Sequence, residues 1–140
     1  MNIKPLILII PAIIGITVFY IIGGNHLLDP KFVFWIKWGD PNQEYLGWEF
    51  FRQAPWSLPL GKNPYFGMEA STSIVYSDSI PLLAILFKLF RSYLTEPFQY
   101  FGIWSLLCFV LQALAAWLLI GTLIKSLQNK ILATFLLCFL

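Results

Sequence analysis

Residues 5–24 read PLILIIPAIIGITVFYIIGG, an apolar stretch that follows Lys4 and ends in two glycines. About 20 helical residues cross a ~30 Å hydrocarbon core, so this stretch predicts a transmembrane helix. It is longer than the ~7 to 15 apolar residues of a cleaved signal peptide and therefore indicates an uncleaved anchor. Lys4 places the amino terminus in the cytoplasm by the positive-inside rule.

The composition agrees with a membrane protein. Of 140 residues, 59% are hydrophobic and 11% are charged, and the mean hydropathy is +0.74; these values lie outside the range of soluble domains. Nine basic and seven acidic residues are scattered along the chain, whereas a nucleic-acid surface requires clustered basic residues. We therefore expect an all-α integral membrane protein that has the lipid bilayer as a partner and binds no nucleic acid.

Two further apolar stretches predict a polytopic arrangement. Residues 98–124, FQYFGIWSLLCFVLQALAAWLLIGTLI, are long enough to span. Residues 79–94 carry Lys88 and Arg91 and are expected to form a short span; the alternative is a re-entrant or interfacial segment. If residues 79–94 span, the basic segment 125–130 lies outside the cell, against the positive-inside rule. If residues 79–94 only re-enter, the segment 125–130 lies in the cytoplasm, as the rule requires.

Residues 131–140 are apolar again but cover only about half a bilayer. A helix that ended there would leave carbonyl groups unsatisfied in lipid. We therefore expect an incomplete span that continues in a larger parent protein, of which residues 1–140 form a single amino-terminal transmembrane module.

Residues 25–78 are expected to form a long external loop, too aromatic for a disordered linker. Inside it, Asp40 before Pro41 predicts a helix start, with Asp40 as N-cap and Gln43 as the partner in a capping box. The helix is expected to end near Gln53, before Pro55.

The spacing within this predicted helix is amphipathic. Leu46 and Phe50 fall on one face, while Glu49 and Arg52 are three residues apart and can form an ion pair on another. This pattern predicts a juxtamembrane helix that lies flat on the outer surface of the membrane.

A second helix start is predicted at residues 77–81, SDSIP, where Asp78 or Ser79 caps the helix and Pro81 lies in its first turn. Capping alone would explain both Asp40 and Asp78. Glu44 and Glu69 are typical of solvated surface charges.

Several separated blocks carry a resemblance to a known family: WGDP (38–41), LGWEFFR (46–52), PLGKNP (59–64), GME (67–69), SIVYSDSIPL (73–82) and PFQYFG (97–102). Together they resemble the amino-terminal region of a family of uncharacterised bacterial multi-pass membrane proteins, a domain of unknown function. That family is itself similar to the GT-C membrane glycosyltransferases.

The resemblance implies an inner-membrane enzyme that transfers a sugar from a polyprenyl-phosphate donor on the outer face. It implies a loop carboxylate that acts as general base or binds a divalent cation such as Mg²⁺ or Mn²⁺. Asp40 matches that carboxylate by position, and Asp78 and Glu69 are further candidates for a second acid or metal ligand. Arg52 and Lys62 are candidates to contact the donor phosphates.

A second class of function is a non-catalytic polytopic membrane protein. In that case the chain belongs to a flippase-like or scaffold subunit whose external loop binds a partner, and Asp40 serves only the helix start. Replacing Asp40 by Asn separates the two classes, since both residues cap a helix well.

Overall fold

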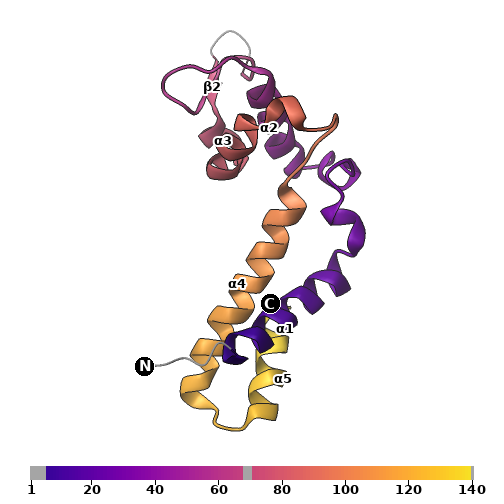
Figure 1. The fold of residues 1–140 in the computed structure, drawn as a ribbon, viewed down its shortest axis with the longest axis vertical. Helices are drawn as coiled ribbons and strands as arrows, with labels where there is room; N and C mark the ends of the chain where they lie inside the picture. Colours follow the sequence, from indigo (N-terminus) through magenta and orange to yellow (C-terminus); the bar gives the residue numbers. More distant parts are fainter. Residues whose placement is uncertain (1–5, 68–70, 140) are drawn as a thin grey trace. The chain divides into compact units, whose positions relative to one another are not determined.

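The apolar stretch at the amino terminus forms helix α1, Leu6–Ile22, as the sequence predicts. The computed structural model describes residues 6–67 and 71–139 (Figure 1). The chain divides into two units: residues 1–29 with 101–140, here called the helix unit, and residues 30–100, here called the loop unit.

The helix unit contains α1, the short 3₁₀ helix η1 (Asn25–Leu28), α4 (Phe101–Leu123) and α5 (Leu127–Leu137). α1 packs along α4, and α5 folds back against α4 after a short turn (Figure 1). The centre of this packing consists of Ile14, Val18, Ala113 and Cys138, with Ile10, Phe109 and Phe135 partly buried around it.

Gly15 allows α1 to approach α4 closely. A Cβ atom at this position would lie 2.6 Å from the carbonyl oxygen of Phe109 and 2.7 Å from Cα of Val110. Small residues at such contacts are characteristic of helix pairs that pack in lipid. Beyond the end of α1, Leu27 of η1 contacts Gly102 at the start of α4, so the two helices run antiparallel.

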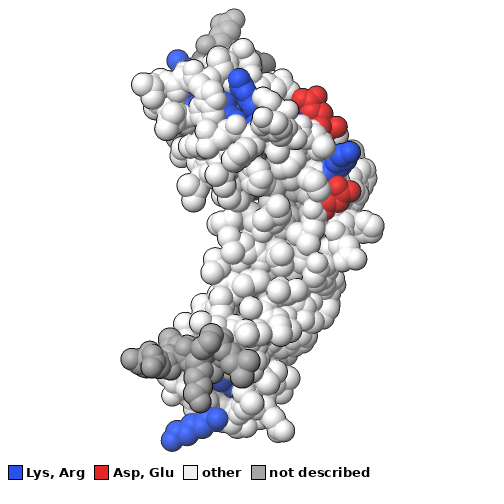
Figure 2. Space-filling view, viewed as in Figure 1, with Lys and Arg blue, Asp and Glu red and all other residues white. Residues whose placement is uncertain are grey.

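Within the described residues, one helix, α4, is long and apolar enough to cross a membrane by its length and composition. α1 is a shorter apolar helix. The described part of the helix unit carries basic side chains at Lys125 and Lys130, on the turn into α5 and on α5 itself. In Figure 2 the blue atoms of this unit accordingly lie at one end, beyond a long uncharged surface.

The loop unit is built around α2, Pro41–Gln53. The elements around it are η2 (Phe34–Ile36), β1 (Lys62–Asn63), β2 (Thr72–Ser73), η4 (Ile74–Ser77), α3 (Pro81–Leu89) and η5 (Arg91–Tyr93). β1 and β2 pair antiparallel with Lys62 opposite Ser73 and Asn63 opposite Thr72. The two ends of the unit meet where the amide of Gln99 donates to the carbonyl of Pro30 at 2.8 Å.

Trp48 lies at the centre of the loop unit and is completely buried. Its Nε1–H donates to the carbonyl of Phe98 at 3.0 Å, and its ring meets Tyr100 edge-on at 5.0 Å. Phe87 of α3 stacks on Tyr100 at 5.2 Å. The sequence prediction for α2 is therefore right in its bounds but wrong in its faces, because the predicted apolar face, Leu46 and Phe50, is the partly exposed one.

The segment 79–94 differs from the predicted span. It forms α3, of nine residues, and then the separate turn η5, whereas a crossing needs about 20 continuous helical residues. Polar side chains explain the break: Lys88 is buried against Phe51, and the Arg91 guanidinium donates to carbonyl groups at the end of α2. This segment packs as part of the loop unit.

The boundaries of the two later helices also differ. The predicted span 98–124 begins three residues later, at Phe101, since Phe98 and Tyr100 are buried in the loop unit. The predicted incomplete span 131–140 begins earlier, at Leu127, and Lys130 lies within the helix with its Nζ 4.0 Å from the ring centre of Trp117.

Candidate functional site

Asp40 directly precedes α2 and is exposed. Its side chain makes no capping hydrogen bond, and Gln43 donates its Nε2–H to the carbonyl of Tyr76 at 3.4 Å. The predicted capping box is therefore wrong. The backbone gives the reason: capping residues take extended angles, whereas Asp40 has φ −60° and ψ −39°. Its carboxylate is consequently exposed to solvent and is not held by a capping hydrogen bond.

Asp78 does not begin the next helix. It ends η4 with a left-handed φ of 51°, and Ile80, not Asp78 or Ser79, precedes Pro81 at the start of α3. Ser79 instead donates its hydroxyl to the carbonyl of Glu44 at 2.6 Å. This bond ties the segment that contains Asp78 to the first turn of α2.

Glu44 is the carboxylate on which the charges of both predicted acids, Asp40 and Asp78, act. Its pKa is raised, first by burial, then by the negative charges of Asp78 and of Asp40. Asp40, Glu44 and Asp78, whose charges interact in this way, are here called the carboxylate group. The sequence pattern around Glu44 is typical of a solvated charge, yet its position four residues after Asp40 is the spacing that brings side chains to one helix face.

The predicted metal site finds no complete ligand set in the described part of the chain. Among those residues, no three His, Cys, Asp or Glu side chains are arranged to hold a metal ion. Glu69, the third predicted acid, lies outside the described residues. The charges of Asp40 and Asp78 both act on Glu44, and the general-base role of Asp40 stays a prediction.

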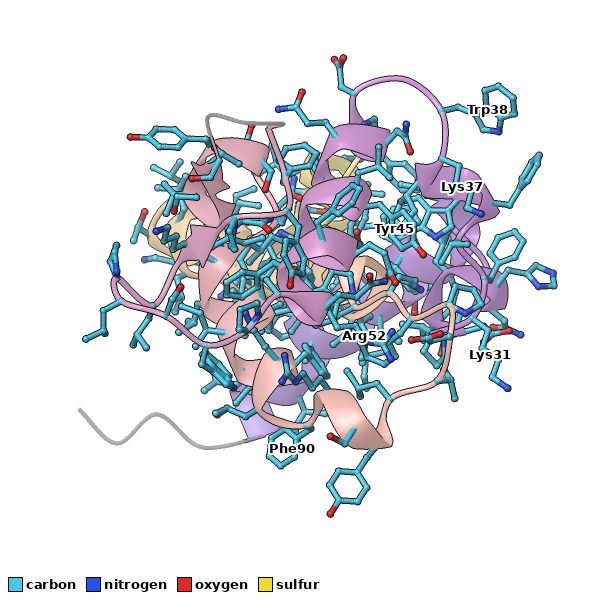
Figure 3. The ribbon with its side chains drawn as sticks, turned by 90° about the horizontal axis from the view of Figure 1, so that it is seen from above. Lys31, Lys37, Trp38, Tyr45, Arg52 and Phe90 are labelled. Atoms are coloured by element: carbon cyan, nitrogen blue, oxygen red, sulfur yellow. The ribbon has the colours of Figure 1, made fainter. Side chains whose placement is uncertain are left out.

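Arg52 is buried, with 4% of its surface exposed (Figure 3). Its Nη1 and Nη2 atoms donate to the carbonyl oxygens of Thr95 and Leu94, each at 3.0 Å. The predicted pair with Glu49 is wrong, since the guanidinium turns toward the segment after η5, where Nη2 lies 3.8 Å from Glu96 Oε1. Glu49 instead accepts a hydrogen bond from Gln53.

Arg91 lies beside Arg52 and was not predicted as a site residue. Its Nη1 donates to the carbonyl oxygens of Ala54 at 2.7 Å and Arg52 at 3.3 Å. The two arginines line an open cavity of about 250 Å³, and the remaining lining residues are Gln53, Ser92 and Glu96. This space is here called the arginine cavity. In the sequence, Arg91 is a basic residue within a predicted span. No local pattern indicates that its side chain contacts the end of α2.

Lys62, the other predicted phosphate contact, is exposed on β1. It is absent from the lining of the arginine cavity. Arg52 and Lys62, the two predicted phosphate contacts, therefore do not line the same cavity.

Lys88 is the other buried cation of the loop unit, with 1% of its surface exposed. Its Nζ lies 3.8 Å from the ring centre of Phe51 and 4.8 Å from that of Trp56. Burial and, to a smaller degree, the positive charge of Arg91 lower the pKa of Lys88 to about 8. Positive charge therefore accumulates between α2, α3 and η5.

Comparison with known proteins gives one relationship. The model of a family described as "Domain of unknown function (DUF6311)" matches residues 12–140. No curated protein and no solved structure matches the chain. The match begins within α1 and covers every described element from η1 to α5, and the chain therefore belongs to the DUF6311 family, a family whose function is unknown.

Proposed function

We propose that this chain forms the amino-terminal part of a polytopic membrane glycosyltransferase similar to the GT-C class, with Asp40 as its general base. The enzyme takes a sugar from a polyprenyl-phosphate donor at the outer face of a bacterial inner membrane. The carboxylate group is the observation that carries this proposal: three acids from two segments gather at the start of α2, and Asp40 is exposed among them.

The proposed chemistry needs a base at the acceptor. An acceptor hydroxyl oxygen attacks the anomeric carbon, the bond from that carbon to the donor phosphate breaks, and the hydroxyl proton passes to Asp40. The phosphate leaves with the bonding electron pair. Glu44, whose pKa is raised by burial and by the charges of Asp78 and Asp40, is a second carboxylate of the same group.

The helix unit supports a topology for this enzyme. In our proposal α1 and α4 both cross the membrane in opposite directions, which agrees with their antiparallel packing. Lys4 in the sequence before α1 then lies on the same side as Lys125 and Lys130, and all three obey the positive-inside rule. The loop unit, residues 30–100, lies on the outer side, since α3 is too short to cross.

The test replaces Asp40 by Asn in the complete gene product that carries this sequence. Sugar transfer from a radiolabelled polyprenyl-phosphate sugar is measured in membranes. Loss of a general base is expected to lower the rate about 10²- to 10⁴-fold. The matched control is Asp29→Asn, which removes another exposed carboxylate, in the helix unit, and leaves the rate unchanged. Wild-type transfer by the Asp40→Asn protein would contradict the proposal.

The alternative function is a non-catalytic subunit whose outer loop binds a partner. One observation favours it: Phe34 and Trp38 pair edge-on at 6.4 Å with 65% and 71% of their surfaces exposed, and Trp38 extends away from the ribbon (Figure 3). Exposed aromatic pairs are typical of interface anchors. Under this alternative, the double change of Phe34 and Trp38 to Ser abolishes function while Asp40→Asn does not.

A further inference from the structure

We propose that the helix unit binds the headgroup of an anionic phospholipid of the surrounding bilayer, at the turn between α4 and α5. The site consists of Lys125, Lys130 and Trp117 and is here called the lysine end. It requires that α4 crosses a membrane, which belongs to the function proposed above, but it does not depend on Asp40. Three observations carry it: positive charge without an acidic partner, a lysine that lies against α4, and exposed leucines next to Lys125 in sequence.

The positive charge of the lysine end is far from any acid of its own unit. Residues 101–140 contain no Asp or Glu, and Asp29 is the single acid in residues 1–29. Asp29 follows Leu27, which contacts Gly102 at the start of α4, whereas the lysines follow the other end of α4. The 23 residues of α4 separate its ends by about 34 Å, several times the ~8 Å over which charges interact at physiological ionic strength. A headgroup phosphate would supply the missing negative charge.

The side chain of Lys130 lies against α4. Its Nζ is 4.0 Å from the ring centre of Trp117, and a Cβ atom on Gly121 would lie 2.5 Å from the same Nζ. The ring therefore orients the ammonium group. Trp117 is 2% exposed, and its Nε1–H is buried with no acceptor among the described residues. All three side chains of the lysine end are hydrogen-bond donors only, so the ligand that suits them is rich in acceptors, as a phosphate is.

Exposed leucines flank Lys125 along the chain. Leu123 lies two residues before it and Leu127 two residues after it, and these side chains are 80% and 55% exposed. Figure 2 shows the blue atoms of this unit at one end of a long uncharged surface. This arrangement suits the boundary of a bilayer, because leucines contact acyl chains while ammonium groups reach the headgroups. A soluble anion would use the charge alone.

The experiment measures lipid binding by the full chain in neutral detergent. The probe is labelled phosphatidylglycerol, followed by fluorescence anisotropy, and the comparison ligand is phosphatidylcholine with the same acyl chains, whose headgroup has no net charge. We expect phosphatidylglycerol to bind at least about tenfold more tightly, because each of the two lysines contributes about fivefold. High salt should reduce this preference. Equal binding of the two lipids would overturn the role of the lysines, and equal binding of glycerol phosphate would overturn the role of the leucines.

Four variants locate the site. Lys125→Gln should weaken binding of phosphatidylglycerol about fivefold, and the double change of Lys125 and Lys130 to Gln should reduce it to the level of phosphatidylcholine. Lys130→Arg keeps both the charge and the stacking on Trp117 and should retain the preference. Lys37→Gln is the matched control, because it removes an exposed positive charge from the loop unit, and it should leave binding unchanged.

Lys125→Gln decides the matter if the double variant fails to fold, because Lys125 is exposed and surface substitutions of this kind change stability little. An unchanged preference in Lys125→Gln, or an equal loss in Lys37→Gln, would overturn the proposal. The two proposals can fail separately, since sugar transfer is tested with Asp40→Asn and lipid binding is measured without any transfer.

Discussion

The helix unit and the loop unit are stabilised by different means. In the helix unit, the buried centre consists of apolar or small residues such as Ile14, Val18 and Ala113. In the loop unit, Arg52, Asn63 and Lys88 are buried beside the aromatic core, and Asn63 donates to the carbonyl of Gly47 at 2.9 Å. A continuous apolar helix thus needs only side-chain packing, while a segment of short elements needs side chains that satisfy its backbone.

The strongest test of this contrast is Arg52→Leu. The substitution keeps an apolar stem but leaves the carbonyl groups of Thr95 and Leu94 without their donors. We expect the loop unit to lose about 3 kcal/mol or more of unfolding free energy. The measurement is denaturant unfolding followed by tryptophan fluorescence, for which buried Trp48 is a reporter. Arg52→Lys restores part of the loss, and a cost under ~1 kcal/mol would mean that these bonds do not hold the unit together.

The corresponding test of the helix unit is Gly15→Leu. Side-chain atoms at this position would meet the backbone of Phe109 and Val110, so we expect α1 and α4 to separate at a cost of about 2 kcal/mol. Disulfide cross-linking between cysteines placed at Ile14 and Ala113 reports the packing. Gly121→Ala is the matched control, since a Cβ atom there meets only the flexible end of Lys130. Equal cross-linking in both variants would show that close approach is not required.

The difference between the units also explains what the sequence could predict. The helix unit follows from runs of apolar residues, and the predicted helix in residues 5–24 and most of that in 98–124 are confirmed as α1 and α4. α4 has the length and composition that a membrane-spanning helix requires. That α1 crosses a membrane stays a prediction.

The loop unit was predicted in part. The bounds of α2 and the place of Pro41 and Pro81 follow from turn and helix-start signals and are confirmed. The extent of the 79–94 segment was wrong because its apolar composition resembles a span, and the contacts that break it connect residues far apart in sequence. Arg91 reaches the carbonyl of Ala54, 37 positions away.

The candidate site shows the same limit. Asp40 and Asp78 were singled out from local helix-start patterns, yet the segment that contains Asp78 is tied to α2 by the hydrogen bond from Ser79 to the carbonyl of Glu44. No spacing rule predicts a bond between residues 35 positions apart. Arg52 was predicted to contact a ligand and proves to be bound chiefly to backbone, and only the structure shows that Arg91 shares a cavity with it.

The buried ammonium group of Lys88 predicts an unusual dependence of stability on pH. The pKa of Lys88 is about 8 in the folded protein, below the ordinary value of 10.5. As the pH rises from about 8 to 10.5, the folded state therefore loses this proton before the unfolded state does, and folding becomes more favourable by about 2 kcal/mol. Below pH 8 this gain is absent.

The measurement is the unfolding free energy of the loop unit at pH 7.5 and at pH 10, in the wild type and in Lys88→Met. Tyrosine ionisation affects both proteins alike, so their difference isolates Lys88. A wild type that loses stability relative to Lys88→Met as the pH rises would contradict the environment that Phe51, Trp56 and Arg91 give to this ammonium group.

The smallest expected effect concerns Asp40. Removal of a side chain that caps a helix costs ~1 kcal/mol, but Asp40 makes no capping bond in this structure. Asp40→Ala is therefore expected to change the unfolding free energy by less than ~0.5 kcal/mol. Ser73→Ala is the comparison, because Ser73 accepts the amide of Val75 at the start of η4.

A cost near 1 kcal/mol for Asp40→Ala would restore the capping role that the sequence predicts. It would also weaken any conclusion drawn from activity, since loss of transfer could then follow from loss of α2. A neutral result instead separates the two explanations: with α2 intact, a loss of sugar transfer in Asp40→Asn reports the chemistry of one carboxylate. The stability of this one residue thus decides how the activity measurement is to be interpreted.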